Sequence, residues 1–283
     1  VVSANVESSE IATCVTPAAA SSGHIARVSI SRNAADFSTH TLDFLYHDPI
    51  QIDSISPSTG PEVGGTDILV RGDGFVPTDD LECLIDSTTR VPATYIRQGQ
   101  ILCSIPQMQH SIGDVTLSVS NNGQQFSVSR STYTFYPQAS VTSVSPSSGP
   151  LHGGTTVSVY GTGFVNDTLS CQFDDMIVPA VFLHSTQIAC ESPSNVDVNS
   201  MVTVSMTNNG QNFASSVASF EYAAVTTISS VTPRSGHLSG GTTLHVRGNN
   251  FVNTGDLLQC RFNATTIRTA EYISETEVRC VLP

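Results

Sequence analysis

Cysteine is the residue type whose spacing carries the clearest chemistry in this sequence. Six of the seven cysteines form three pairs whose members lie 20, 19 and 20 residues apart: Cys83/Cys103, Cys171/Cys190 and Cys260/Cys280. One pair recurs in each repeated segment of the chain, which predicts one disulfide bond per segment. Closing a loop of about 20 residues stabilises the folded state by about 3 kcal/mol in the chain-entropy model. The pairs indicate an oxidising compartment, outside the cell or at its surface.

Two other interpretations of the cysteines are weaker. Buried free thiols of a cytosolic protein would not require two cysteines at fixed positions of each repeat, and zinc would need a Cys-x-x-Cys or paired histidines. The seventh cysteine, Cys14, lies in ATCVTP (12–17), which aligns with ILCSIP (101–106), IACESP (188–193) and VRCVLP (278–283). Cys14 is therefore the second member of a pair, and its disulfide partner is expected before residue 1.

Two N-glycosylation sequons begin at Asn166 and Asn263, and both are predicted to carry N-linked glycans in a secreted protein. Asn166 follows Phe164 in an expected surface loop. Asn263 occupies the place of Asp86 and Asp174 in the earlier repeats, so a turn-stabilising role of its side chain competes with glycosylation. Repeated Ser-Pro and Thr-Pro dipeptides are further candidates, for O-linked sugar.

The remaining polar motifs do not predict catalysis, a cofactor or a metal ion. Asp79-Asp80 and Asp174-Asp175 lack the Asp-x-Asp-x-Asp-Gly order of a calcium loop. Arg71-Gly72-Asp73 spells the integrin-binding tripeptide, but its glycine lies at a position that every repeat keeps. The eight histidines recur at no fixed repeat position, and no Ser/His/Asp order or carboxylate pair appears. The chain is therefore not expected to be an enzyme.

Charge and composition exclude other classes of partner. The 283 residues carry 24 acidic and 11 basic side chains, a formal net charge of −13, and all the bases are arginine. Nucleic acids and anionic membranes favour clustered lysine and arginine, so neither is expected to bind. No stretch approaches the roughly 18 apolar residues of a membrane span, so no membrane insertion is expected. No methionine or signal segment opens the chain, and residue 1 is interpreted as a processed or arbitrary beginning.

The cysteines and sequons lie in a repeated framework, which a motif that occurs three times reveals. ISPSTGPEVGGT (55–66), VSPSSGPLHGGT (144–155) and VTPRSGHLSGGT (231–242) place their prolines 89 and 87 residues apart. A second block, VTLSVSNNGQQFS (115–127), recurs as VTVSMTNNGQNFA (202–214) and more faintly as ARVSISRNAADFS (26–38). Short alternating apolar runs between glycine- and proline-rich turns predict an all-β chain. The period of about 88 residues is the size of one β-sandwich domain.

Individual positions within the repeat have expected roles. Ile68/Val70 and their counterparts alternate on a strand and should face the core. Gly72-x-Gly74 is expected to break that strand, and Asn250 replaces the second glycine in the last repeat because asparagine tolerates positive φ. Asn122-Gly123 predicts a tight hairpin. In the first repeat, Arg32-Asn33-Ala34 replaces Asn-Asn-Gly, and a wider hairpin is expected there.

The Pro-x-x-Gly-x-x-x-Gly-Gly-Thr opening, the Gly-x-Gly-Phe segment and the Asn-Asn-Gly-Gln-x-Phe block resemble the IPT/TIG family of immunoglobulin-like domains. The resemblance covers the whole chain, and it implies tandem β-sandwiches that form a rod stiffened by Pro49 and Pro137 in short linkers. The expected domains are the C-terminal part of one repeat (1–48), two complete repeats (49–137 and 138–224) and the N-terminal part of a fourth (225–283). The chain is thus expected to be a window on a longer array.

The family occurs in plexin and Met-type receptor ectodomains, in Rel-type transcription factors and in extracellular arrays of unicellular organisms. The absence of lysine, the negative charge and the paired cysteines exclude the transcription factors. The first functional hypothesis is a structural subunit of an extracellular filament, a flagellar hair (mastigoneme) or a surface coat of a unicellular eukaryote, whose partners are copies of itself or related repeat proteins. The alternative is a recognition or adhesion ectodomain such as that of a plexin-like receptor. A spacer in a larger secreted enzyme is a third hypothesis.

Overall fold

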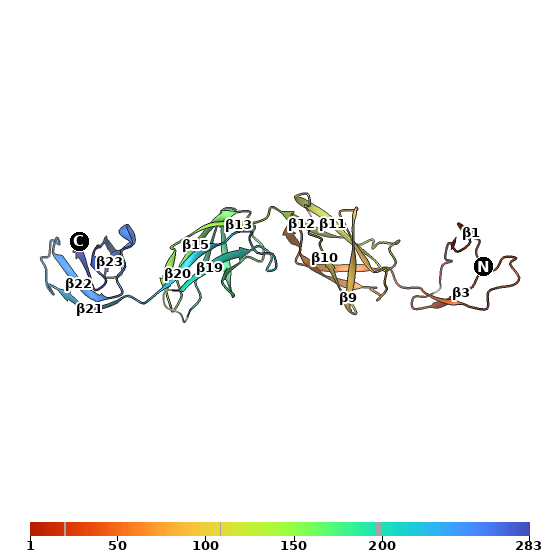
Figure 1. Ribbon diagram of the computed structural model, residues 1–283, viewed down its shortest axis with the longest axis horizontal. Helices are drawn as coiled ribbons and strands as arrows, with labels where there is room; N and C mark the ends of the chain where they lie inside the picture. Colours follow the sequence, from red (N-terminus) through yellow and green to blue (C-terminus); the bar gives the residue numbers. More distant parts are fainter. Residues whose placement is uncertain (20, 108, 196–199) are drawn as a thin grey trace. The chain divides into compact units, whose positions relative to one another are not determined.

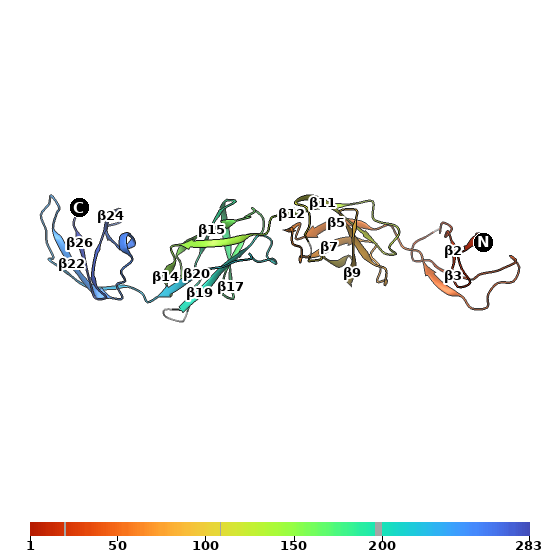
Figure 2. The ribbon, with the colours of Figure 1, turned by 45° about the horizontal axis from the view of Figure 1, so that its top comes forward.

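The computed structural model describes residues 1–19, 21–107, 109–195 and 200–283. It forms two compact units, Val1–Gln138 and Ala139–Pro283, which Figures 1 and 2 show as β-sheet structures. Within the described residues there is no α-helix, and the single helical turn is the 3-10 turn η1 (Gly255–Leu257). The prediction of an all-β chain is therefore confirmed for the residues that the structure describes.

The first complete sandwich contains eight strands in two packed sheets, β5-β7-β10-β9 and β9-β8-β11-β12-β6. Strand β9 belongs to both sheets, since its residues 89–92 pair with β8 and its residues from Ala93 onward pair with β10. The strands of this first sandwich are β5 (Gln51–Ser56), β6 (Thr59–Pro61), β7 (Asp67–Asp73), β8 (Glu82–Ile85), β9 (Thr89–Arg97), β10 (Gln100–Ser104), β11 (Gly113–Ser120) and β12 (Ser131–Tyr136).

The second sandwich repeats this topology strand for strand in the order β13-β15-β18-β17-β16-β19-β20-β14. Strand β17 is the counterpart of β9 and crosses between the sheets at the same place, immediately after a proline. The strands of the second sandwich are β13 (Ser140–Ser145), β14 (Ser148–Pro150), β15 (Thr156–Thr162), β16 (Ser170–Phe173), β17 (Met176–His184), β18 (Gln187–Glu191), β19 (Ser200–Thr207) and β20 (Ala218–Ala223).

The residues before and after the two sandwiches form smaller sheets. The N-terminal segment has two antiparallel pairs, β1 (Ala4–Val6) with β2 (Ala12–Cys14) and β3 (Ile25–Val28) with β4 (Leu42–Leu45). The C-terminal sheets have the orders β21-β22-β26-β25 and β23-β24. Their strands are β21 (Thr227–Thr232), β22 (Thr243–Asn249), β23 (Gln259–Phe262), β24 (Thr266–Thr269), β25 (Glu271–Ser274) and β26 (Glu277–Val281).

Each sandwich has its own hydrophobic core between the two sheets. The alternating residues Ile68/Val70, Val157/Val159 and Leu244/Val246 are buried, as the sequence predicted. The aromatic pairs that close each repeat pack edge to face, with ring centroids 5.0 Å apart for Tyr133/Phe135 and 5.2 Å apart for Phe220/Tyr222.

The predicted strand break needs a correction. Gly72 and Gly161 lie inside β7 and β15, opposite Ile52 and Val141, where the partner strand has a bulge. A Cβ on Gly161 would overlap the Ser140 carbonyl oxygen, so this glycine is required by the close approach of the two backbones. The third residue of the motif directly follows the strand in a left-handed conformation, with φ of 74° at Gly163, and Asn250 adopts φ of 62° as predicted.

The predicted tight hairpins are five-residue loops. An isolated bridge joins Thr207 to Phe213, so residues 208–212 form the turn. The N-terminal segment has the same loop length, with a bridge from Ser31 to Phe37, and the prediction of a wider hairpin was wrong. Ala34 adopts φ of 61°, a left-handed conformation that an alanine rarely takes.

An asparagine inside each loop explains this shared shape. The Oδ1 atom of Asn33 accepts the N–H groups of Ala35 and Asp36. Asn122 and Asn209 make the same pair of bonds in the two sandwiches. The Asx turn, rather than the glycine that follows it, therefore sets the loop geometry.

Candidate functional sites

Disulfide bonds join the two sheets of each sandwich. Cys83–Cys103 connects β8 to β10 with its Cα atoms 6.2 Å apart, and both side chains are fully buried. Cys171–Cys190 connects β16 to β18 in the second sandwich, and Cys260–Cys280 connects β23 to β26. Cys14 lies on β2, exposed and outside these bonds. Its expected partner before residue 1 stays a prediction.

The two sequons lie on exposed loops of different kinds. Asn166 is exposed in the loop between β15 and β16. Asn263 follows β23 in a left-handed turn with φ of 53°, which matches φ of 48° at Asp174. The Asp174 carboxylate accepts the backbone N–H of Thr203 at 2.7 Å and the Thr203 hydroxyl at 2.8 Å. The turn-stabilising role that the sequence suggested for this position is thus present at Asp174.

Buried asparagines fix the loop that follows β7 or β15. In the second sandwich, Asn208 Oδ1 accepts the Val165 N–H at 3.0 Å, and its Nδ2 donates to the Gly163 carbonyl at 2.8 Å. Asn121 makes the same two bonds, to Val76 and Gly74, in the first sandwich. The sequence analysis missed this role because Asn-Asn-Gly was interpreted as a hairpin turn. The recurrence of the first asparagine of that triplet was the available signal.

Asn208→Ala is expected to lower the free energy of unfolding of the second sandwich by about 2 kcal/mol. The substitution leaves the Val165 N–H and the Gly163 carbonyl without their buried partner. Hydrogen exchange of peptides from residues 139–223, followed in the intact chain by mass spectrometry, measures the loss. Val217→Ala, at an exposed position of the same sandwich, is the control, with an expected change below about 0.5 kcal/mol. Equal effects of the two substitutions would contradict the assigned role.

A tyrosine hydroxyl ties the last strand of a repeat to the proline that follows its second cysteine. Tyr222 donates to the Pro193 carbonyl at 2.7 Å, and Tyr46 donates to the Pro17 carbonyl at 2.9 Å. The first sandwich has Phe135 at this place. There His110 stacks on the Phe135 ring at 4.4 Å, and its Nε2 lies 3.2 Å from the Pro106 carbonyl oxygen. With hydrogen on Nε2, His110 supplies the missing donor.

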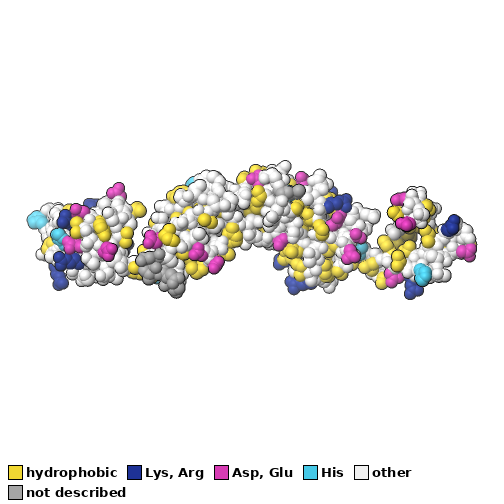
Figure 3. Space-filling view, viewed as in Figure 1, with side chains coloured by type: hydrophobic (Ala, Val, Ile, Leu, Met, Phe, Trp, Pro, Cys, Tyr) yellow, Lys and Arg dark blue, Asp and Glu magenta, His cyan; other side chains and the backbone are white. Residues whose placement is uncertain are grey.

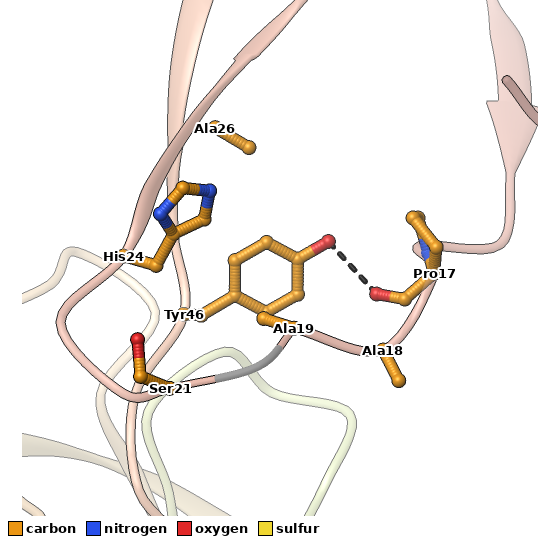
Figure 4. Close-up of a pocket in the computed structure, with 7 residues that line it drawn as sticks. All are labelled: Pro17, Ala18, Ala19, Ser21, His24, Ala26 and Tyr46. Atoms are coloured by element: carbon orange, nitrogen blue, oxygen red, sulfur yellow. Dashed lines mark hydrogen bonds between the residues drawn. The ribbon is translucent and has the colours of Figure 1, made fainter.

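A hollow lies beside Tyr46 in the N-terminal segment. Figure 4 shows Tyr46 with its hydroxyl toward Pro17 and with His24, Ala18 and Ala19 around it. In the second sandwich the equivalent residue, Tyr222, is buried, and β14 runs beside it in parallel with β20. The hollow therefore corresponds to the place of a β14-type strand.

Tyr133 carries the one large pKa shift resolved in the described residues. Burial raises the pKa of the Tyr133 hydroxyl to about 12, and the neighbouring Thr66 hydroxyl opposes part of the change. The second sandwich has Phe220 at this position, so the hydroxyl is not required by the fold.

Tyr133 is expected to make the first sandwich sensitive to alkali. Because the pKa of the Tyr133 hydroxyl in the folded state, about 12, lies above its ordinary value of 10.0, the stability gained by burying the protonated hydroxyl is fully present below pH 10 and is lost as the pH rises through about 12. The loss approaches about 2–3 kcal/mol. Absorbance at 295 nm should show a tyrosine titrating near pH 12 that is missing in Tyr133→Phe. If the transition that Tyr133→Phe removes lies near pH 10, the raised pKa of Tyr133 is contradicted.

The other sequence motifs do not assemble into sites. Arg71-Gly72-Asp73 lies within β7, which pairs with β5 on one side and β10 on the other. Among the residues that the structure describes, no three His, Cys, Asp or Glu side chains gather as metal ligands. No described helix has the length and hydropathy that a membrane span requires.

The outer face of one sheet differs strongly between repeats. On the C-terminal sheet this face carries two ion pairs, Arg279–Glu271 at 2.9 Å and Arg247–Glu277 at 3.4 Å, and a hydrogen bond between His245 and Glu277 at 2.8 Å. The first sandwich has a mixed face, with Leu69, Arg71, Thr94, Ile96 and Leu102. The second sandwich has no charge at the matching positions, which are Ser158, Tyr160, Val181, Leu183, Gln187 and Ala189. We call this last set the uncharged face.

Comparison with known proteins identifies relatives over most of the chain. The model of the IPT/TIG domain family matches residues 49–135, 139–222 and 226–283. Plexin-A4 of Danio rerio is 28% identical over 249 residues, which are 82% of this chain and 13% of that protein. Fibrocystin-L of Mus musculus is 26% identical over 283 residues, 98% of this chain and 6% of that protein.

A solved structure of the full extracellular region of plexin A4, domains 1 to 10, is 22% identical with a TM-score of 0.46, covering 83% of this chain and 21% of that one. The chain thus spans a small fraction of the proteins that it matches, about an eighth of the plexin and less of fibrocystin-L.

Proposed function

Because the chain belongs to the IPT/TIG domain family, we propose that it is part of a cell-surface recognition or adhesion ectodomain. Membership confirms the resemblance that the repeated motifs indicated. The chain is extracellular or at the cell surface, which agrees with its three disulfide bonds and its plexin and fibrocystin-L relatives. We propose a binding role without catalysis, with a macromolecular partner at the cell surface.

The observation that carries this proposal is the divergence of one face between otherwise similar sandwiches. A subunit that only packs on copies of itself would favour the same surface in every repeat. Here the backbone topology repeats strand for strand, while the uncharged face of the second sandwich replaces the ion-paired face of the C-terminal sheet. This divergence lies on the outer face of a sheet, where a partner can reach it.

The test is electron microscopy and sedimentation of the native full-length protein, released from its source without denaturant. Dispersed particles that bind to cells are the expected result. Regular fibres with an axial repeat of a few sandwich domains would overturn the proposal in favour of a structural subunit of a filament, mastigoneme or coat. The low proportion of charged residues, 12%, is the observation that favours this second candidate, because few charges protect the sheet edges from pairing.

We also propose N-linked glycans at Asn166 and Asn263. Both side chains are exposed, as an enzyme-added glycan of this size requires. Enzymatic deglycosylation in heavy-oxygen water should convert both residues to labelled aspartate, which peptide mass spectrometry detects. Unlabelled asparagine at either position in protein from the native source would remove that site.

A further inference from the structure

Strand β17 of the second sandwich is an edge of both sheets. Its residues Met176–Pro179 pair with β16, and Ala180–His184 pair with β18. Neither half pairs with a second strand in the part of the chain that the structure describes. The backbone of each half can therefore accept one more strand along its other side.

The outward side chains of β17 are apolar and exposed. Ile177, Val181 and Leu183 are 57%, 62% and 49% exposed, and Met176 begins the strand at 40%. The inward residues Val178, Ala180 and Phe182 pack against the core. Ile177, Val181 and Leu183 alternate along the strand, and Val181 and Leu183 are part of the uncharged face.

The equivalent strands of the other repeats carry the charges that normally protect a sheet edge. Strand β9 carries Arg90 and Arg97, and Arg90 is held by Glu82 at 2.7 Å. At the place of Val181, β25 has Glu271, which pairs with Arg279. Strand β17 has no Asp, Glu, Lys or Arg. Of the three equivalent strands β9, β17 and β25, β17 is therefore the one without charged side chains to prevent pairing at its edge.

Charges around β17 define the partner. The second sandwich contains no lysine or arginine, and Asp174 and Asp175 are exposed directly before the strand. Figure 3 shows acidic side chains over this sandwich and dark blue arginines on the C-terminal sheets. The charged side chains of the second sandwich are all acidic, so pairing β17 with a second copy would bring two negatively charged sandwiches together, which disfavours it. A partner strand with basic residues at its ends would complement the acidic residues of this sandwich.

We propose that β17 is a docking edge for an extended segment of a partner protein that alternates apolar residues and carries Lys or Arg at its ends. The segment adds a strand beside Ala180–His184, so main-chain hydrogen bonds supply affinity and the outward side chains of Val181 and Leu183 supply the apolar contact. This inference names a partner chemistry for the proposed recognition function and rests on it.

The test uses two fluorescein-labelled peptides, Arg-Val-Thr-Val-Thr-Val-Thr-Val-Arg and the same peptide with Glu at both ends. Fluorescence anisotropy should show the Arg-ended peptide binding the intact chain at least about tenfold more tightly than the Glu-ended one. Val181→Lys should weaken that binding by at least about tenfold. Thr94→Lys, at the equivalent place on β9, is the matched control and should leave it unchanged.

Three results would overturn the proposal: no binding of the Arg-ended peptide, equal binding of both peptides, or binding that Val181→Lys does not weaken. Self-association of the chain that Val181→Lys abolishes, measured by analytical ultracentrifugation, would replace the partner with a second copy and also overturn it. Binding of the native protein to cells tests the recognition function separately. Retained cell binding without peptide binding would reject the docking edge alone, and absent cell binding would reject the recognition function.

Discussion

Gly161→Ala is expected to lower the free energy of unfolding of the second sandwich by at least about 4 kcal/mol. The new Cβ would overlap the Ser140 carbonyl oxygen and lie 2.6 Å from the Phe164 ring. A backbone oxygen cannot turn aside as a side chain can, so β13 must separate from β15 at this point. Hydrogen exchange of peptides from β13 and β15 in the intact chain should show both strands exchanging much faster.

Gly154→Ala is the matched control for this substitution. Gly154 also lies in the second sandwich and has φ of 79°, but an added Cβ would meet only Glu191 Oε1 at 3.8 Å. Its expected cost is the left-handed conformation of an alanine, about 1–2 kcal/mol. A Gly161→Ala variant no less stable than Gly154→Ala would show that the two strands can move apart without penalty, against the argument above.

Removing the disulfide Cys171–Cys190 by a double substitution to alanine is expected to cost about 3 kcal/mol. The bond closes a loop across 19 residues and joins opposite sheets. Its loss therefore raises the conformational entropy of the unfolded state and removes a crosslink through the core. Urea unfolding of the double variant and the parent chain, with hydrogen exchange to assign the transition to residues 139–223, measures the difference. An unchanged midpoint would refute the stabilising role.

The order of reduction gives an independent check on the three bonds. Cys171 and Cys190 are buried, whereas Cys260 is half-exposed in the C-terminal sheets. Dithiothreitol under native conditions should therefore reduce Cys260–Cys280 first, and the two buried bonds only after their sandwiches open. Alkylation with iodoacetamide at timed intervals, followed by peptide mass spectrometry, reads the order.

The fold was predictable because the same pattern of apolar positions recurs in each repeat of the sequence. The alternating pair Val157/Val159 and the aromatic pair Phe220/Tyr222 are typical of strands that face a core, and all four residues are buried. The loops were predicted less well. Asn-Gly favours a two-residue turn locally, but Asn208 is committed to Val165 and Gly163, which are more than 40 residues away in the sequence. No local pattern records such a contact.

The candidate docking edge was hidden from the sequence for a different reason. The apolar run around Val181 and Leu183 looks like any core strand, and only its pairing shows that one row faces outward at the edge of a sheet. Comparison with Arg90 and Glu271 becomes informative once the structure aligns the three strands. The chemistry of this surface depends on the register of β17 in the sheet as well as on its composition.

The exchange of Tyr222 for Phe135 and His110 has a consequence for building hybrid arrays. In the first sandwich two residues from different segments share the task that one tyrosine performs in the second. Grafting a last strand from one module into another would therefore either leave a proline carbonyl without its donor or place a tyrosine hydroxyl and an imidazole against the same oxygen. For protein engineering, the boundaries of each module must therefore enclose both members of each compensating pair.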